Sequence, residues 1–202
     1  MFIEIPLGNK SNMRRLVFGV GLNDAEYIVK PIINGKQLCC PYYAKWKDMI
    51  VRCYSEKEQK RYPTYIGCTV CGEWLFFSKF KAWMINQDWQ DKQLDKDLLV
   101  QGNKLYSPET CLFISSAINK LLINRKASRG IHSQGVDFNR RANQYRARVR
   151  VNGKSKHLGF FDTDNEAFNS YKVAKYEIIK DIALQQTEPL KSALLNYKIS
   201  EY

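Results

Sequence analysis

Hydrophobic and polar residues alternate without a break over residues 145–151, which read Tyr-Arg-Ala-Arg-Val-Arg-Val. This period predicts a β-strand with one buried face and one exposed face. Asn152 and Gly153 follow, and this pair is typical of a two-residue hairpin turn because both residues tolerate positive φ. We therefore expect a returning strand over residues 154–160 and a first strand over residues 135–139, which together give a three-stranded antiparallel sheet.

The returning strand leads into a helix with a matching apolar stripe. Leu158 and Phe160 are the expected core positions of that strand. Residues 163–166, Thr-Asp-Asn-Glu, have the spacing of a capping box, in which the first and last residues bond each other's backbone N–H groups. Apolar residues then recur at helical spacing and should cover the buried face of the sheet; they are Ala167, Tyr171, Ala174, Ile178 and Ile182.

The middle of the chain shows helical periodicity between short strand-like segments. Residues 41–54 carry a helical pattern that opens with proline, and a second apolar stripe covers residues 76–84. Ser107 with Pro108 has the form of an N-cap followed by a first-turn proline, which predicts a helix that continues to Asn124. Two strand-like segments precede this helix, and the order strand, strand, helix is that of a ββα unit.

These elements predict an α+β protein: a ββα module followed by a three-stranded antiparallel sheet packed on one helix. The module with its N-terminal extension is expected over residues 1–124. A small, polar and basic connector over residues 125–134 leads to the sheet domain, residues 135–184. Residues 185–202 form a tail, either a short docking helix or a mobile end.

Charge changes the interpretation of the exposed sheet face. The chain has 202 residues and a formal net charge of +12, and residues 129–157 contain 8 Lys or Arg with one acid, Asp137. A solvated face is the plain alternative, but clustering of one sign favours a phosphate-binding surface, and a two-stranded ribbon fits the DNA major groove. We therefore expect double-stranded DNA to be contacted by Arg140, Arg141, Arg146, Arg148, Arg150, Lys154 and Lys156.

Other classes of protein and site are disfavoured. No stretch approaches the roughly 20 apolar residues of a membrane span, and the first residues lack the order of a signal peptide. We expect a cytoplasmic protein without a membrane partner, whose six cysteines are thiols or metal ligands rather than disulfides. Cys68 and Cys71 form half of a zinc knuckle that Cys111 could complete, although buried thiols acting as small apolar residues are the favoured interpretation.

The C-terminal pattern resembles a known DNA-binding domain. Gly-Val-x-Phe from residue 135, Tyr-Arg-Ala-Arg-Val from residue 145 and Lys-His-Leu-Gly-Phe-Phe-Asp-Thr from residue 156 carry the likeness. They are similar to the Apetala-two/ethylene-response-factor domain, which occurs in plant transcription factors and in phage and mobile-element nucleases. The resemblance implies a three-stranded sheet in the major groove, with Arg146, Arg148 and Arg150 on the DNA-facing strand.

The middle section resembles the HNH endonucleases of phages and introns. The likeness rests on Val-Cys-Gly-Glu-Trp at residues 70–74 and on Tyr-Ser-Pro-Glu-Thr-Cys at residues 106–111. It implies that Asp95 and Thr110 hold a divalent ion, Mg²⁺ or Mn²⁺, and that Lys96 stands where the family has its catalytic histidine.

Catalysis by this module is the point on which the sequence departs from the family. Asp97 could assist Asp95, because strand alternation places both carboxylates on one face and carboxylates suit hard cations. Histidine activates water near neutral pH without tuning, whereas lysine needs a pKa lowered by burial. Neither histidine of the chain, His132 or His157, lies in the ββα unit. A weakened or lost nuclease and an active Mg²⁺-dependent nickase both remain as interpretations.

Our hypothesis from the sequence is a double-stranded DNA-binding protein of phage or mobile-element type, related to HNH homing endonucleases, in the cytoplasm of a bacterial or phage-infected cell. The first alternative is an active endonuclease that uses Asp95. The second is a protein-interaction role for the N-terminal module, which would block another DNA-acting enzyme. Trp74, Trp83 and Trp89 are its candidate anchors, although tryptophan at such spacing is more often part of a core.

Overall fold

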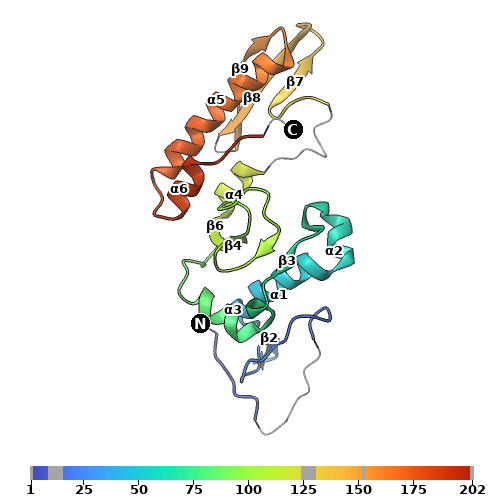
Figure 1. The fold of residues 1–202 in the computed structure, drawn as a ribbon, viewed down its shortest axis with the longest axis vertical. Coiled ribbons are helices and arrows are strands. Elements are labelled where there is room, and N and C mark those ends of the chain that lie inside the picture. The colour runs from blue at the N-terminus through green and yellow to red at the C-terminus, as the bar shows by residue number, and fades with distance from the viewer. Residues whose placement is uncertain (1, 9–15, 124–130, 152, 201–202) are drawn as a thin grey trace. The chain divides into compact units, whose positions relative to one another are not determined.

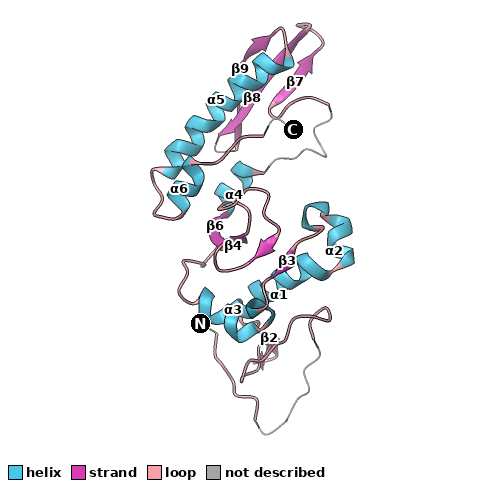
Figure 2. Cartoon of the chain, in the orientation of Figure 1, coloured by secondary structure: helices cyan, strands magenta, loops and turns pink. Residues whose placement is uncertain are grey.

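The computed structural model describes residues 2–8, 16–123, 131–151 and 153–200. The chain divides into two compact units, Met1–Ser115 and Ser116–Tyr202, whose elements are labelled in Figure 1. Each unit mixes helices with short strands (Figure 2), which confirms the predicted α+β class. In the described part of the chain, no helix is long and apolar enough to cross a membrane.

The N-terminal unit is built from helices joined by very short strands. Its sheets are two-stranded: β1 with β2 and β4 with β6 are antiparallel, and β3 with β5 is parallel. The elements in chain order are β1 (Ile32–Ile33), β2 (Lys36–Gln37), α1 (Pro41–Tyr54), α2 (Glu56–Arg61), η1 (Pro63–Tyr65), β3 (Thr69–Val70), η2 (Glu73–Leu75), α3 (Phe77–Met84), β4 (Lys92–Asp95), β5 (Leu105–Tyr106) and β6 (Leu112–Ser115).

The two helices predicted in this unit are confirmed as α1 and α3. Their apolar faces meet in a core around Trp46, Trp74 and Phe77, each no more than 1% exposed. Trp46 donates from Nε1 to the Trp74 carbonyl at 2.7 Å, so its buried indole N–H is satisfied. Trp83 and Trp89 are partly buried against the same core. The tryptophans of this unit therefore contribute to its packing.

The helix predicted to start at Ser107 begins later than expected. The Ser107 carbonyl accepts from the N–H groups of Thr110 and Cys111 at 3.2 and 3.0 Å, which closes a single turn. The chain then extends as β6, because residues 112–115 pair with β4 along its whole length. The next helix starts only after this strand. A local cap signal is thus outweighed by pairing with a strand far away in the sequence.

The C-terminal unit is a three-stranded antiparallel sheet of order β7-β8-β9, with α5 along one face (Figure 1). This confirms both the sheet and the helix predicted from the sequence. The elements are α4 (Ser116–Leu122), β7 (Val136–Asn139), β8 (Gln144–Val151), β9 (Lys154–Phe161), α5 (Asp164–Ala183) and α6 (Leu190–Leu195).

Helix α5 begins where the sequence predicts. Thr163 Oγ1 accepts from the Glu166 N–H at 3.2 Å, and the Glu166 carboxylate accepts from the Thr163 N–H at 3.2 Å, which forms the predicted capping box. Ala167 and Tyr171 of this helix are buried in one cluster with Ala147 of β8. Burial of the helix stripe against the sheet stabilises both elements.

Phe160 is not a core residue, and this prediction was wrong. Leu158 is an extra residue of β9, inserted between two positions that pair with β8, and so forms a β-bulge. The insertion inverts the alternation of side chains beyond it. Leu158 and Phe161 therefore pack against the core, whereas Phe160 pairs with Arg146 on the opposite face and is 42% exposed.

The segments on either side of the sheet domain pack within the C-terminal unit. The last part of the predicted connector, residues 131–134, caps α5: the Ser133 hydroxyl donates to the Asp164 carboxylate, and His132 Nδ1 lies 3.1 Å from Asp164 Oδ1. The rest of the connector and Asn152 of the predicted hairpin turn lie outside the described residues. The tail contains α6, and Tyr197 Oη donates to the Leu122 carbonyl at 3.1 Å, so the docking alternative is confirmed.

Candidate nucleic-acid interface

The sheet of the C-terminal unit carries α5 on one face, and we call the opposite face the outer face. Residues that pair across antiparallel strands share a face, so the strand register assigns each side chain to a side. The outer face consists of Asp137 and Asn139 from β7, Gln144, Arg146, Arg148 and Arg150 from β8, and Ser155, His157 and Phe160 from β9. The three arginines predicted to face DNA are thus brought together.

A single carboxylate binds two of these arginines. Arg146 donates from Nη2 to Asp137 Oδ2 at 2.7 Å and from Nε to Oδ1 at 3.4 Å. Arg148 donates from Nε to the same Oδ1 at 3.1 Å, and its Nη2 lies 3.0 Å away. The side chains of Asp137, Arg146 and Arg148 remain 35, 30 and 45% exposed, so this cluster is open to a ligand.

The ion pairs change the titration of Asp137. Burial alone would raise the pKa of its carboxyl group, but the hydrogen bonds and charges of Arg146 and Arg148 outweigh burial and hold the pKa below its usual value. Asp137 is therefore ionised at neutral pH, and the cluster carries both signs of charge. In the sequence, Asp137 stands out only as the lone acid of a basic stretch, because its bonding partners depend on the strand register.

The remaining predicted arginines lie around this cluster. Arg150 is exposed on the outer face, and Arg140 and Arg141 are exposed in the turn between β7 and β8. That turn is ordered by Asn139, whose Oδ1 accepts from the N–H groups of Arg141 and Ala142, both at 3.0 Å. Cationic side chains thus extend along the outer face from the β7–β8 turn to the hairpin end of β8 and β9.

Lys154 and Lys156 are on the other side of the sheet. Lys154 pairs with Val151 and Lys156 pairs with Val149, which belong to the face that carries α5. Both lysines are exposed, but the structure does not bring them together with the arginines. Lys154 and Lys156 therefore serve as a matched control, in the same hairpin, for the arginines of the outer face.

An aromatic pair on the outer face was not expected from the sequence. His157 and Phe160 have ring centroids 4.9 Å apart, and Phe160 lies opposite Arg146. No local signal in the sequence marks the bulge at Leu158 that turns Phe160 outwards. The outer face therefore combines guanidinium groups with aromatic rings, both of which contact nucleic-acid bases.

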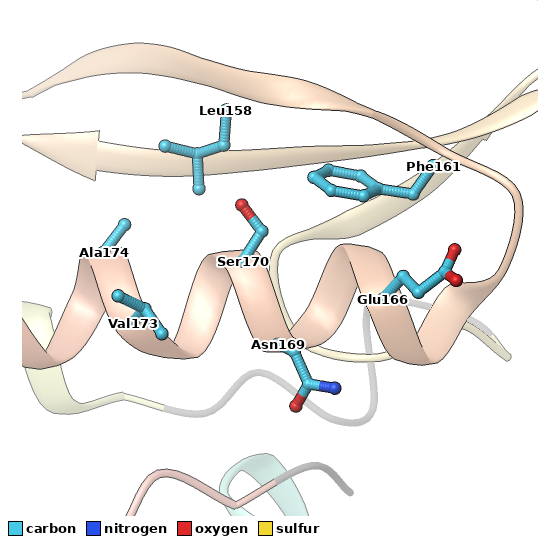
Figure 3. Close-up of a pocket in the computed structure, with 7 residues that line it drawn as sticks. All are labelled: Leu158, Phe161, Glu166, Asn169, Ser170, Val173 and Ala174. Carbon is cyan, nitrogen blue, oxygen red and sulfur yellow. The ribbon is translucent and has the colours of Figure 1, made fainter.

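The face that carries α5 has a different character. Figure 3 shows a shallow hollow between β9 and α5, where Leu158 and Phe161 lie above Ser170 and Ala174 of the helix. Most of its lining is apolar. This hollow offers no cationic group to a phosphate, which separates it chemically from the outer face.

In the N-terminal unit, Asp95 is the last residue of β4, and its carboxylate organises the turn that follows. Its Oδ1 accepts from the N–H groups of Asp97 and Leu98 at 3.0 and 2.8 Å. Burial, and next the negative charge of Asp97, raise the pKa of Asp95 to about 6. Because β4 ends at Asp95, Asp97 lies in the turn, and the predicted alternation of both residues along one strand was wrong.

Two cations of α1 hold β4 in place. Lys45 Nζ donates to the Lys92 carbonyl at 2.6 Å, and Arg52 Nη1 donates to the Leu94 carbonyl at 3.3 Å. Lys45 and Arg52 lie about two helical turns apart on one side of α1, and their acceptors are alternate residues of the strand. This arrangement fixes the backbone that carries Asp95.

Lys96, at the position expected for a catalytic base, is 6% exposed and is bonded within the loop. Its ammonium donates to Asp97 Oδ2 at 3.1 Å and to the Asn103 carbonyl at 3.0 Å. Asn103 in turn donates from Nδ2 to the carbonyls of Lys96 and Leu105, both at 2.6 Å. A base needs a free lone pair on nitrogen, whereas this bonding is that of a charged ammonium that bridges a loop.

The candidate metal ligands do not form a closed cluster. The Thr110 hydroxyl donates to the Leu105 carbonyl at 2.7 Å. Among the described residues, no three His, Cys, Asp or Glu side chains are grouped so that they could hold a metal ion. A Mg²⁺ or Mn²⁺ ion at Asp95 would have Asp95 and Asp97 as its protein carboxylates, and such ions commonly complete their shell with water and phosphate oxygens.

The cysteines of the predicted zinc site are separate thiols. All six cysteines of the chain are free. Cys68 and Cys111 are buried, and burial raises the pKa of Cys111 to about 12. Cys71 is partly buried, and burial raises its pKa as well. In these surroundings the thiols pack as small apolar side chains.

Comparison of the chain with protein-family models, curated proteins and solved structures found no match in any of the three.

Proposed function

We propose that this chain is a double-stranded DNA-binding protein that grips the duplex with the outer face of its C-terminal unit. The observation that carries the proposal is the set of three arginines, Arg146, Arg148 and Arg150, on one side of β8 with no helix of the described residues covering them. A narrow antiparallel sheet can enter the major groove, where guanidinium groups bond guanine and phosphate. The resemblance to the Apetala-two/ethylene-response-factor domain supports the same orientation.

The distribution of charge within the C-terminal unit also supports this orientation. Four of the eight acids of this unit lie in α5, together with three lysines, so this helix is close to neutral. The exposed arginines lie on the outer face and in the β7–β8 turn. A unit with one basic side and one nearly neutral side is oriented by the field of a polyanion before contact. The outer face would therefore meet DNA first.

The test compares two pairs of cations on opposite faces of one hairpin. Arg148→Ala with Arg150→Ala should weaken binding to duplex DNA roughly 10- to 100-fold, because loss of a single bidentate base contact already costs about 1–3 kcal/mol. Lys154→Ala with Lys156→Ala removes the same charge from the other face and should weaken binding less. Fluorescence anisotropy with a labelled duplex, over a series of salt concentrations, measures both affinity and the number of phosphate contacts.

Circular dichroism of each variant establishes that the fold is retained. If the arginine pair and the lysine pair lose the same affinity for DNA, the outer face is not the preferred DNA-binding side of the unit. Wild-type affinity that does not change between low and moderate salt would contradict phosphate binding altogether.

We further propose that the N-terminal unit is a nuclease-like scaffold in which cleavage is lost or weak. The supporting observation is the bonding of Lys96 to Asp97 and Asn103, which uses its ammonium as a loop bridge at the position where the HNH family has a histidine. Water activation at this position would require a proton acceptor, whereas the bonded ammonium of Lys96 is a donor. Asp95 lies at the end of β4, as expected for the metal-binding acid, but no histidine follows it.

Nicking of supercoiled plasmid tests this second proposal. Wild-type protein in Mg²⁺ or Mn²⁺ should produce no more nicked circles than protein in EDTA or the Asp95→Ala variant. Metal-dependent nicking that disappears in Asp95→Ala would contradict the proposal and identify an endonuclease that works without histidine.

A further inference from the structure

The centre of the proposed DNA-binding face contains a negative charge, which a surface built only for phosphate would not need. Asp137 lies between Arg146 and Arg148 and bonds both. Its carboxylate is ionised at neutral pH and repels phosphate, so it lowers the general attraction for DNA. A group that weakens nonspecific attraction at this position must act on the arginines themselves.

The bonded atoms show how Asp137 orients its partners. Arg146 uses Nε and Nη2, at 3.4 Å from Oδ1 and 2.7 Å from Oδ2. Arg148 also uses Nε and Nη2, at 3.1 and 3.0 Å from Oδ1. Both guanidinium groups thus present the same edge to one carboxylate. The Nη1 hydrogens and one Nη2 hydrogen of each arginine remain for another acceptor.

That remaining edge is the one suited to guanine. A guanidinium donates through Nη1 and Nη2 to guanine O6 and N7, which are adjacent acceptors in the major groove. A side chain already held by a carboxylate loses less rotamer entropy on making these bonds than a free arginine does. In the described part of the chain no carboxylate bonds Arg150, so Arg150 has the freedom expected of a phosphate contact.

We propose that Asp137 is a positioning residue that sets sequence selectivity, by holding Arg146 and Arg148 so that they read guanine in duplex DNA. The inference rests on the proposed DNA-binding function and adds the base that the site recognises. The arginines then have two different roles: Arg146 and Arg148 discriminate between sequences, and Arg150 with the turn arginines supplies general affinity.

The test removes one acceptor from guanine and leaves phosphates and base pairing unchanged. Duplexes bound by the full chain are selected from a random-sequence pool, and the preferred duplex is then made with guanine or with 7-deazaguanine, which lacks the N7 acceptor. The wild type should bind the 7-deazaguanine duplex roughly 10-fold more weakly or worse, as expected for a broken bidentate contact. Asp137→Asn and Asp137→Ala should reduce this discrimination, while their affinity for random duplexes stays equal or rises.

Asp162→Asn is the matched control, because Asp162 bonds Gln144 at 3.0 Å rather than an arginine. It removes the same charge from the same unit and should leave the discrimination within about 2-fold of wild type. Asp137→Asn keeps the shape of the side chain, which protects the test from loss of folding. Equal wild-type binding of both duplexes, or full discrimination in the Asp137 variants, would overturn the inference while DNA binding stands. Absence of any salt-dependent duplex binding would overturn the proposed function and this inference together.

Discussion

The two units of this chain use their basic side chains in different ways. The N-terminal unit has 16 Lys and Arg against 12 Asp and Glu, and the C-terminal unit has 16 against 8. In the N-terminal unit, several cationic side chains donate to backbone carbonyls of the fold. Lys45 donates to Lys92, Arg52 to Leu94, Lys96 to Asn103 and Lys104 to Thr64.

The C-terminal unit instead presents its cations on an open sheet face. Arg146 and Arg148 bond a carboxylate that is itself on the surface, and Arg150 is exposed beside them. The number of positive charges is therefore a poor guide to a nucleic-acid footprint when taken alone. What separates the two units is whether the donors are used within the fold or are left for a ligand.

The largest effect is expected from a change that strikes only the C-terminal unit. Gly135 has φ +79°, and a Cβ added there would lie 2.1 Å from the Tyr171 ring of α5. Gly135→Ala should therefore lower the unfolding free energy of this unit by about 3 kcal/mol or more, because strain and overpacking add. Hydrogen exchange of peptides from α5 measures the loss. Tryptophan fluorescence should change little, since all four tryptophans belong to the N-terminal unit.

Gly153→Ala is the control for this change. Gly153 has nearly the same backbone angle, φ +78°, but nothing lies within 4 Å of the added Cβ. The loss there should be about 1 kcal/mol, the cost of the backbone conformation alone. Similar losses at both glycines would show that the contact of Gly135 with Tyr171 does not hold helix and sheet together. A matching shift in tryptophan fluorescence would show that the units do not unfold separately.

The sequence predicts those parts of the fold that short-range patterns determine. The alternation over residues 145–151 and the capping box at residues 163–166 gave β8 and α5 correctly, because each depends on neighbours along the chain. Two predictions that depend on distant partners were wrong. Ser107 starts a turn because the following residues pair with β4, and Phe160 faces outwards because of a bulge at Leu158.

The candidate interface shows the same difference between features set by short-range patterns and features set by distant partners. The arginines of β8 could be found from the alternation of polar and apolar residues alone, which places them correctly on one face. Their bonding to Asp137 could not, since it requires the register between β7 and β8. Lys154 and Lys156 have the right charge in the right hairpin, yet their pairing with Val151 and Val149 puts them on the other side. Composition identifies the hairpin, and strand pairing decides which of its cations share a surface.

A smaller difference between the units should appear in their response to pH, because each contains an ionisable side chain whose pKa is shifted by burial, an acid in one unit and a base in the other. Burial, followed by the charge of Asp97, raises the pKa of Asp95 from 3.8 to about 6, and burial lowers the pKa of Lys175 from 10.5 to about 8. Folded Asp95 holds its proton more tightly than the unfolded chain does, so the N-terminal unit should lose stability as pH rises from about 4 to about 6. Folded Lys175 holds its proton less tightly, so the C-terminal unit should gain stability as pH rises from about 8 to about 10.5.

Across its pH range each change in unfolding free energy should amount to about 3 kcal/mol, because one pKa unit corresponds to about 1.4 kcal/mol, and each should vanish in one variant only. Asp95→Asn keeps the acceptor for the N–H groups of Asp97 and Leu98 and removes the titration. Lys175→Met keeps the length of the buried side chain and gives up its bond to the Tyr171 hydroxyl at 3.0 Å. Denaturant titrations in EDTA, followed by tryptophan fluorescence for the N-terminal unit and by hydrogen exchange in α5 for the C-terminal unit, separate the two. Wild-type slopes that persist in both variants would mean that neither side chain is buried as a charge, and the contrast between the units would then rest on the arginine face alone.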